Sequence, residues 1–118
     1  MADQLVSIDP PAPLGDDATL VAVRGEVTFA NADALTRTLG AGLAEGRERL
    51  VVDISEVPFM DSSGISALLG ASVQAGREGR SVAVVHAGEE PPGIFRFKGV
   101  ERLLRLFPSR EAAVARQA

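Results

Sequence analysis

Two adjacent hydroxyls, Ser62 and Ser63, are the residues best placed to carry chemistry, within the sequence FMDSSGI at residues 59–65. The run follows a strand-like apolar segment at residues 50–54 and opens a helix-like segment at residues 65–74. The first turn of a helix has unpaired backbone N–H groups and a partial positive charge, which favour a phosphate. Phosphorylation would add roughly two negative charges and three acceptor oxygens. The pattern therefore suggests a reversible phosphorylation site.

A structural role for residues 61–64 is an equally open interpretation, because Asp and Ser favour the starts of helices through their own hydrogen bonds. On these residues alone, capping and regulation have about equal weight. Phe59 and Met60 favour regulation slightly, because such a pair can anchor the loop and hold the serines at its rim.

Enzymatic chemistry has little support in the sequence. A Ser–His–Asp site needs a base, and the only histidine is His86, at the end of a predicted strand, where a lone His is more often a surface or capped residue. The hydrolase pattern Gly-x-Ser-x-Gly is absent. The chain has no Cys, which excludes disulfides and thiol catalysis and argues against a zinc site. We therefore predict no catalytic residue, no bound metal and no cofactor.

The composition indicates an ordinary globular domain. The chain has 118 residues, and we expect residues 1–118 to form one domain. A net charge of −4 argues against direct binding of nucleic acid. No apolar run approaches the ~20 residues of a membrane span. The first residues lack the basic and apolar regions of a signal peptide, so the expected location is the cytoplasm.

The elements that must position the serines follow from periodicity and from helix and turn signals. The sequence predicts strands at residues 4–8, 19–24, 50–54, 82–85 and 103–106, and helices at 31–46, 65–74, 94–98 and 110–117. Asn31 and Ser109 are predicted N-caps of the first and last helix. Helical spacing predicts a buried apolar face in each of the two long helices: Ala32, Leu35, Leu39 and Leu43 in the first, and Ile65, Leu68, Leu69 and Val73 in the second. The prolines of residues 9–13 are expected to end the first strand. The order β-β-α-β-α-β-α-β-α predicts an α/β fold with a small mixed sheet and packed helices. The continuously apolar segments at 50–54 and 82–85 are expected to be central strands.

Three segments, in this order, resemble the STAS-domain anti-sigma factor antagonists of bacteria. The first is Gly25-Glu26-Val27, followed by Ala32 and Leu35. The second is residues 50–69, centred on FMDSSG, and it is the most specific. The third is residues 99–109, followed by Ala112 and Ala113. The resemblance covers nearly the whole chain and implies the STAS fold.

The resemblance implies that Ser62, directly after Asp61, is phosphorylated by a partner that is both an anti-sigma factor and a serine kinase. The unphosphorylated protein would bind this anti-sigma factor and release a sigma factor. Phosphorylation would break this complex, and a serine phosphatase would restore the unphosphorylated, binding form. Thr28 stands where the family often has Asp. The partner-binding loop around the phosphorylation site would comprise Thr28, Met60, Asp61, Ser63 and Gly64.

A second function is compatible with the same fold. The chain could be a STAS scaffold subunit of a stress-sensing or lipid-transport complex, in which Ser62 only starts a helix. The complete acceptor sequence favours the antagonist over this alternative.

Overall fold

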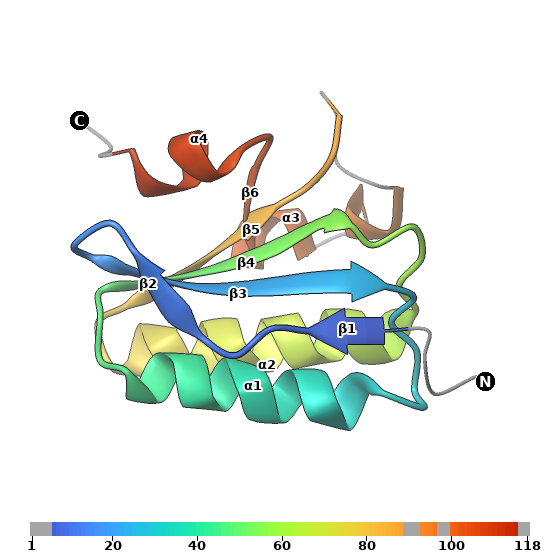
Figure 1. Cartoon of the computed structure of the whole chain (residues 1–118). Coiled ribbons are helices and arrows are strands. Elements are labelled where there is room, and N and C mark those ends of the chain that lie inside the picture. Colours follow the sequence, from blue (N-terminus) through green and yellow to red (C-terminus); the bar gives the residue numbers. More distant parts are fainter. Residues whose placement is uncertain (1–5, 89–92, 97–99, 116–118) are drawn as a thin grey trace.

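The computed structural model describes residues 6–88, 93–96 and 100–115 and shows a twisted sheet with helices on both faces (Figure 1). The strands are β1 (Val6–Ile8), β2 (Ala12–Leu14), β3 (Ala18–Gly25), β4 (Arg49–Glu56), β5 (Ser81–Val85) and β6 (Arg105–Phe107). The helices are α1 (Ala32–Ala44), α2 (Ser62–Arg77), α3 (Val100–Leu103) and α4 (Arg110–Val114), with a 3₁₀ helix at Gly93–Arg96.

The sheet is mixed, as the sequence predicts. Its strand order is β1-β3-β4-β5-β6, and β2 also pairs with β3. β1 and β2 are antiparallel to β3, whereas β3, β4, β5 and β6 pair in parallel. The two apolar strands β4 and β5 are neighbours inside the sheet, which confirms their predicted central position. Parallel strands leave their carboxyl ends at one edge, and the loops after β3 and β4 emerge there.

The first strand ends at Ile8, before the prolines of residues 9–13, as predicted, but a second short strand that was not predicted follows at Ala12–Leu14. The chain leaves β1, and β2 then pairs with β3 with Pro13 opposite Thr19. The segment that connects β1 and β2 stays bonded to β3, because the N–H of Asp9 donates to the carbonyl of Ala22 at 3.0 Å. β1 and β2 follow each other along the same side of β3 (Figure 1), so β2 is an edge strand. Proline is tolerated at an edge because its missing N–H is not needed for a further strand.

The C-terminal elements also differ from the prediction. Residues 100–103 form α3, and the last strand begins only at Arg105. The N–H of Leu104 donates to the carbonyl of Val100 at 2.9 Å, which closes the last turn of α3, and the side chain of Leu104 is buried in the core. The predicted helix at 94–98 is a 3₁₀ helix at Gly93–Arg96, and residues 97–99 lie outside the described residues. Ser109 caps α4 as predicted, since its hydroxyl accepts from the N–H of Ala112 at 3.1 Å.

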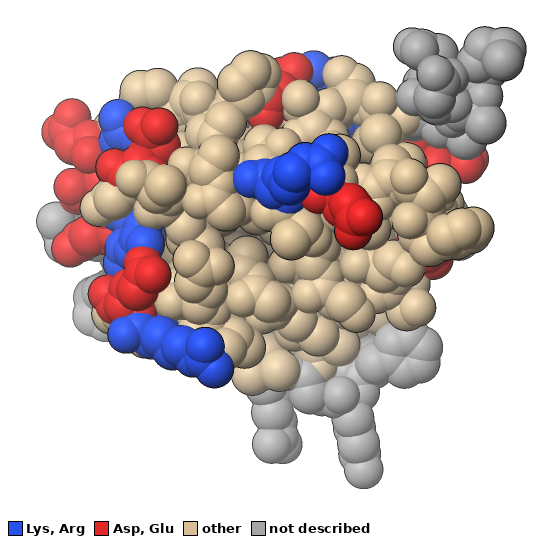
Figure 2. Space-filling model, turned by 90° about the horizontal axis from the view of Figure 1, so that it is seen from below, with Lys and Arg blue, Asp and Glu red and all other residues tan. Residues whose placement is uncertain are grey.

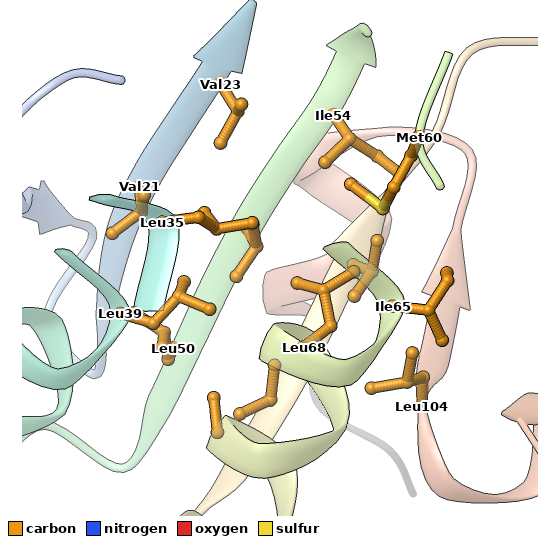
Figure 3. Packing of buried hydrophobic residues seen from close by; sticks show 14 of the residues in the cluster. Val21, Val23, Leu35, Leu39, Leu50, Ile54, Met60, Ile65, Leu68 and Leu104 are labelled. Carbon is orange, nitrogen blue, oxygen red and sulfur yellow. The ribbon is translucent and has the colours of Figure 1, made fainter. Parts of the chain in front are cut away.

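The main core lies between the sheet and the helices α1 and α2, which cover one face together (Figure 1). Side chains alternate along β4, so Leu50 enters this core and Val51 enters a smaller cluster on the opposite face. Figure 3 shows the packing of the core residues Val21, Val23, Leu35, Leu39, Leu50, Ile54, Met60, Ile65, Leu68 and Leu104.

The two long helices bury their predicted faces with one exception. α1 buries Leu35, Leu39 and Leu43, as its spacing predicts. α2 buries Ile65 and Leu68, but Val73, expected on the same apolar stripe, is exposed. The positions of α2 that face the core further along are alanines, Ala71 and Ala75. Small side chains there let the second half of α2 approach the sheet closely.

The opposite face of the sheet is covered by the short helix α4. Ala113 packs against Val51 and Ala83 there. Two arginines also hold α4: Arg49 donates to the carbonyl of Ala113, and the Nε of Arg110 lies 2.6 Å from Oδ2 of Asp53. Burial tends to raise the pKa of the Asp53 carboxyl, but hydrogen bonds from Ser55 and the ion pair with Arg110 outweigh burial and lower that pKa below its ordinary value.

Arg110→Ala is expected to reduce the free energy of unfolding by about 1 kcal/mol at neutral pH, because it removes a partner of a buried carboxylate. The folded-state pKa of Asp53 is lowered, so this stabilisation is present above the ordinary pKa of 3.8 and is lost as the pH falls through the lowered value. Urea unfolding of the wild type and the variant over this range measures the effect. If the difference in free energy of unfolding between the two proteins stays the same as the pH falls, Arg110 stabilises the fold through packing and not through charge.

Candidate functional site

The site is built where two loops meet at the carboxyl edge of the sheet. The loop after β3 and the loop after β4 pair through a short parallel bridge between Val27 and Met60. The N–H of Val27 donates to the carbonyl of Phe59 at 2.9 Å, and the N–H of Asp61 donates to the carbonyl of Val27 at 2.9 Å. The bridge fixes the start of α2 beside the loop that leads into α1.

The carboxylate of Asp61 joins these two loops a second time. Its Oδ1 accepts from the N–H of Ser63 at 2.8 Å, which caps α2. Its Oδ2 accepts from the N–H of Phe29 at 3.0 Å, across the loop pair. α2 therefore begins at Ser62, three residues before the predicted start at Ile65.

Ser62 is exposed at the first position of α2, whereas Ser63 is half-buried. The sequence suggests unpaired N–H groups in this turn, but three of them already bond to Asp61. Besides the N–H of Ser63, those of Gly64 and Ile65 donate to the Asp61 carbonyl at 3.1 and 3.3 Å. A phosphate on Ser62 would therefore lie next to a like charge, the Asp61 carboxylate, and not in a ring of free donors.

Met60 and Gly64 are structural members of the predicted partner-binding loop. Met60 is buried in the main core, whereas Phe59 is 52% exposed, so only Met60 anchors the loop as expected of the pair. Figure 3 shows Met60 entering the core beside the start of α2. A Cβ built on Gly64 would lie 2.5 Å from Cγ of Met60 and 2.8 Å from Cγ1 of Val27. The bridge between the two loops thus requires glycine at this position.

Thr28 and Asn31 shape the loop before α1. The N–H of Thr28 donates to Oδ1 of Asn31 at 3.0 Å, and the hydroxyl of Thr28 accepts from the N–H of Ala30 at 3.2 Å. Asn31 is the residue before α1, as predicted, but its side chain makes no capping hydrogen bond to the helix. Its amide instead donates to the carbonyl of Glu26 at 3.0 Å. Both side chains fix the turn that carries Phe29.

Phe29 is a part of the site that the sequence pattern did not predict. Its side chain is 82% exposed, which is the highest value for any large apolar residue in the described part of the chain. The available signal was an aromatic residue in a short loop between the strand end at Gly25 and the polar residue Asn31. That signal is weak, because many loop aromatics fold back onto the core.

The outer surface of α1 and α2 continues from this site. A groove of about 550 Å³ runs between the two helices, starting at Phe29 and Ser63 and reaching Gln74. The two helices contain only three charged residues, Asp33, Arg37 and Arg77. Figure 2 views this face and shows it largely uncharged, with Asp, Glu, Lys and Arg gathered mainly at one end. The exposed serine therefore adjoins a surface of low charge.

His86 differs from its predicted environment. It is buried at the end of β5, and its Nδ1 lies 3.2 Å from the carbonyl oxygen of Ala87. Within the described ranges, no group of three or more His, Cys, Asp or Glu side chains is arranged to hold a metal ion. No described helix is long and apolar enough to cross a membrane.

Comparison with solved structures places the fold among anti-sigma factor antagonists. An antagonist from Mycobacterium paratuberculosis matches with a TM-score of 0.79 and 27% sequence identity, over 92% of this chain and 90% of that one. The Bacillus cell fate determinant SpoIIAA, an anti-sigma factor antagonist, matches in its unphosphorylated form with a TM-score of 0.69 and 12% identity, over 90% of this chain and 92% of that one. Its phosphorylated form matches with a TM-score of 0.64 and 16% identity, over 90% and 96% of the two chains.

Comparison by sequence gives the family. No curated protein matches the chain with significance. The family model described as the STAS domain matches residues 9–113, which include both loops of the site and all of α1 and α2. The small α/β fold, its mixed sheet and the solved structures that it resembles agree with this match. The chain belongs to the STAS domain family.

Proposed function

We propose that this protein is a cytoplasmic anti-sigma factor antagonist, switched by phosphorylation of Ser62. In its unphosphorylated form it binds an anti-sigma factor that has serine kinase activity, and a sigma factor is released. The kinase ends this interaction by modifying Ser62, and a serine phosphatase reverses the modification. The protein itself acts by binding and not by catalysis.

The position of Ser62 is the observation that carries the proposal. Its hydroxyl is exposed at the first residue of α2, where a partner's active site can approach it. The carboxylate of Asp61, the residue before Ser62, accepts hydrogen bonds from the N–H groups of Ser63 and Phe29. The two loops are thereby joined next to Ser62, which presents its hydroxyl on a rigid backbone. The M. paratuberculosis protein that shares this fold at 27% identity is an anti-sigma factor antagonist, which supports the same role here.

Mass spectrometry of the protein purified from its own cells tests the proposal. Peptides that span residues 57–77 contain Ser62 together with Ser63, Ser66 and Ser72, so the fragment spectra must assign the phosphate to one of them. We expect phosphate on Ser62, with an occupancy that changes between growth and stress conditions. Exposed Ser66, one turn further along α2, serves as the internal control and should remain unmodified.

The scaffold alternative predicts a different result. An unmodified Ser62 under every condition, together with co-purification of membrane transporter subunits, would assign the domain to such an assembly. Ser62 would then be only the first residue of α2. The phosphorylation state of Ser62 and the proteins that co-purify, both measured on one preparation of the native protein, therefore distinguish the two functions.

A further inference from the structure

We propose that Phe29 is the apolar anchor through which the kinase partner recognises this site, with its ring inserted into an apolar pocket of the anti-sigma factor. This inference rests on the proposed function, because it names a contact of the same partner. It assigns a binding role to a residue outside the acceptor sequence at residues 59–65. The supporting observations are the exposure of the ring, the rigidity of its backbone and its place beside Ser62.

Exposure alone would not distinguish Phe29, since single apolar residues are common on protein surfaces. The ring is 82% exposed, whereas the other exposed large apolar residues range from Val114 at 41% to Leu103 at 54%. Few charged residues surround the ring: Phe29 lies at one end of the groove between α1 and α2, and Asp33 is the only charged residue that lines this groove. A rim with few charged residues around an aromatic side chain suits an apolar pocket and disfavours a highly charged one.

The backbone that carries Phe29 is held on both sides. Its own N–H is bonded to Asp61, and the N–H of the next residue, Ala30, is bonded to the hydroxyl of Thr28. Thr28 is in turn bonded to Asn31. A ring on a fixed backbone loses little conformational freedom on binding, which is the property of an anchor residue and not of a mobile loop tip.

Its position relative to Ser62 identifies the occupant. One carboxylate, that of Asp61, bonds both the N–H of Phe29 and the first turn of the helix that begins with Ser62. A specific protein interface covers about 800 Å² on each partner. A kinase that reaches the Ser62 hydroxyl must therefore also cover Phe29. Covering a phenyl ring without giving it an apolar pocket would forgo the largest area of exposed apolar surface at the site.

The test uses the purified serine kinase that modifies Ser62 of the full-length protein. Phe29→Ala is expected to weaken binding of this kinase about tenfold or more and to raise KM with little change in kcat, since the ring contributes to binding and not to chemistry. Phe29→Leu should recover part of the affinity because it keeps an apolar side chain. The matched control is Val114→Ala, which trims an exposed apolar side chain on α4, on the opposite face of the sheet.

Two results would overturn the inference. One is wild-type affinity and KM for Phe29→Ala. The other is a loss of affinity matched by a fall in Tm, which would show that the ring supports the fold. Ser62→Asp, measured in the same assay, separates the two proposals. If Ser62→Asp loses binding while Phe29→Ala keeps it, only the anchor is wrong, whereas wild-type binding by Ser62→Asp contradicts the switch itself.

Discussion

Ser62→Asp is expected to weaken binding to the anti-sigma factor by roughly thirty- to two-hundredfold, the equivalent of about 2–3 kcal/mol. The substitution places a carboxylate on an exposed position that adjoins a surface of low charge and already has Asp61 as its neighbour. On binding, the new charge would have to lose water next to another carboxylate. Ser62→Ala should bind as tightly as the unmodified protein and stay bound in the presence of kinase and ATP. Calorimetry or surface plasmon resonance with the purified anti-sigma factor measures both variants.

A control for nonspecific charge repulsion lies on the same helix. Gln74→Glu adds one negative charge to the exposed side of α2, twelve residues beyond Ser62 and therefore about 18 Å away along the helix axis. This variant should lose much less affinity than Ser62→Asp. Equal affinities for Ser62→Asp and Ser62→Ala would contradict the switch. Equal losses for Ser62→Asp and Gln74→Glu would mean that the partner responds only to the net charge of the helical face.

The parts of this fold that the sequence predicts are those with a long periodic pattern. The spacing of Leu35, Leu39 and Leu43 identifies the buried face of α1, and the continuous apolar run in β4 identifies a strand buried on both faces. The short elements are less predictable. β2, α3 and β6 have only three or four residues each, so tertiary pairing decides their structure and local preference does not.

The candidate site is predictable from sequence only in part, for the same physical reason. A helix that starts close to Asp61 and Ser62 follows from residue types, because a carboxylate before a helix accepts from its first N–H groups. The second bond of Asp61 joins it to Phe29, 32 residues earlier in the chain, and depends on β3 and β4 being parallel neighbours. The exposure of Phe29 and the burial of His86 also depend on tertiary packing. Neither can be deduced from the identity of the residue.

Gly64→Ala is expected to reduce the free energy of unfolding by about 1–3 kcal/mol, although alanine normally stabilises a helix relative to glycine by up to about 1 kcal/mol. The reason is steric. The added Cβ would lie 2.5 Å from Cγ and 2.9 Å from Sδ of Met60, and 2.8 Å from Cγ1 of Val27. Both neighbours are buried in the main core and form the bridge between the loops, so neither can move without disturbing the site. Urea unfolding followed by circular dichroism measures the change.

Gly70→Ala provides the matched control within the same helix. A Cβ at Gly70 meets nothing within 4 Å, so this substitution should be neutral or should stabilise the fold by up to about 1 kcal/mol. A loss of stability in Gly64→Ala but not in Gly70→Ala would locate the effect at the contact with Met60 and Val27. Because those two residues set the loop that presents Asp61 and Ser62, Gly64→Ala should also impair phosphorylation of Ser62 under conditions where the variant is still folded. If Gly64→Ala were as stable as Gly70→Ala and phosphorylated at the wild-type rate, the close packing of the two loops would have no part in presenting the serine.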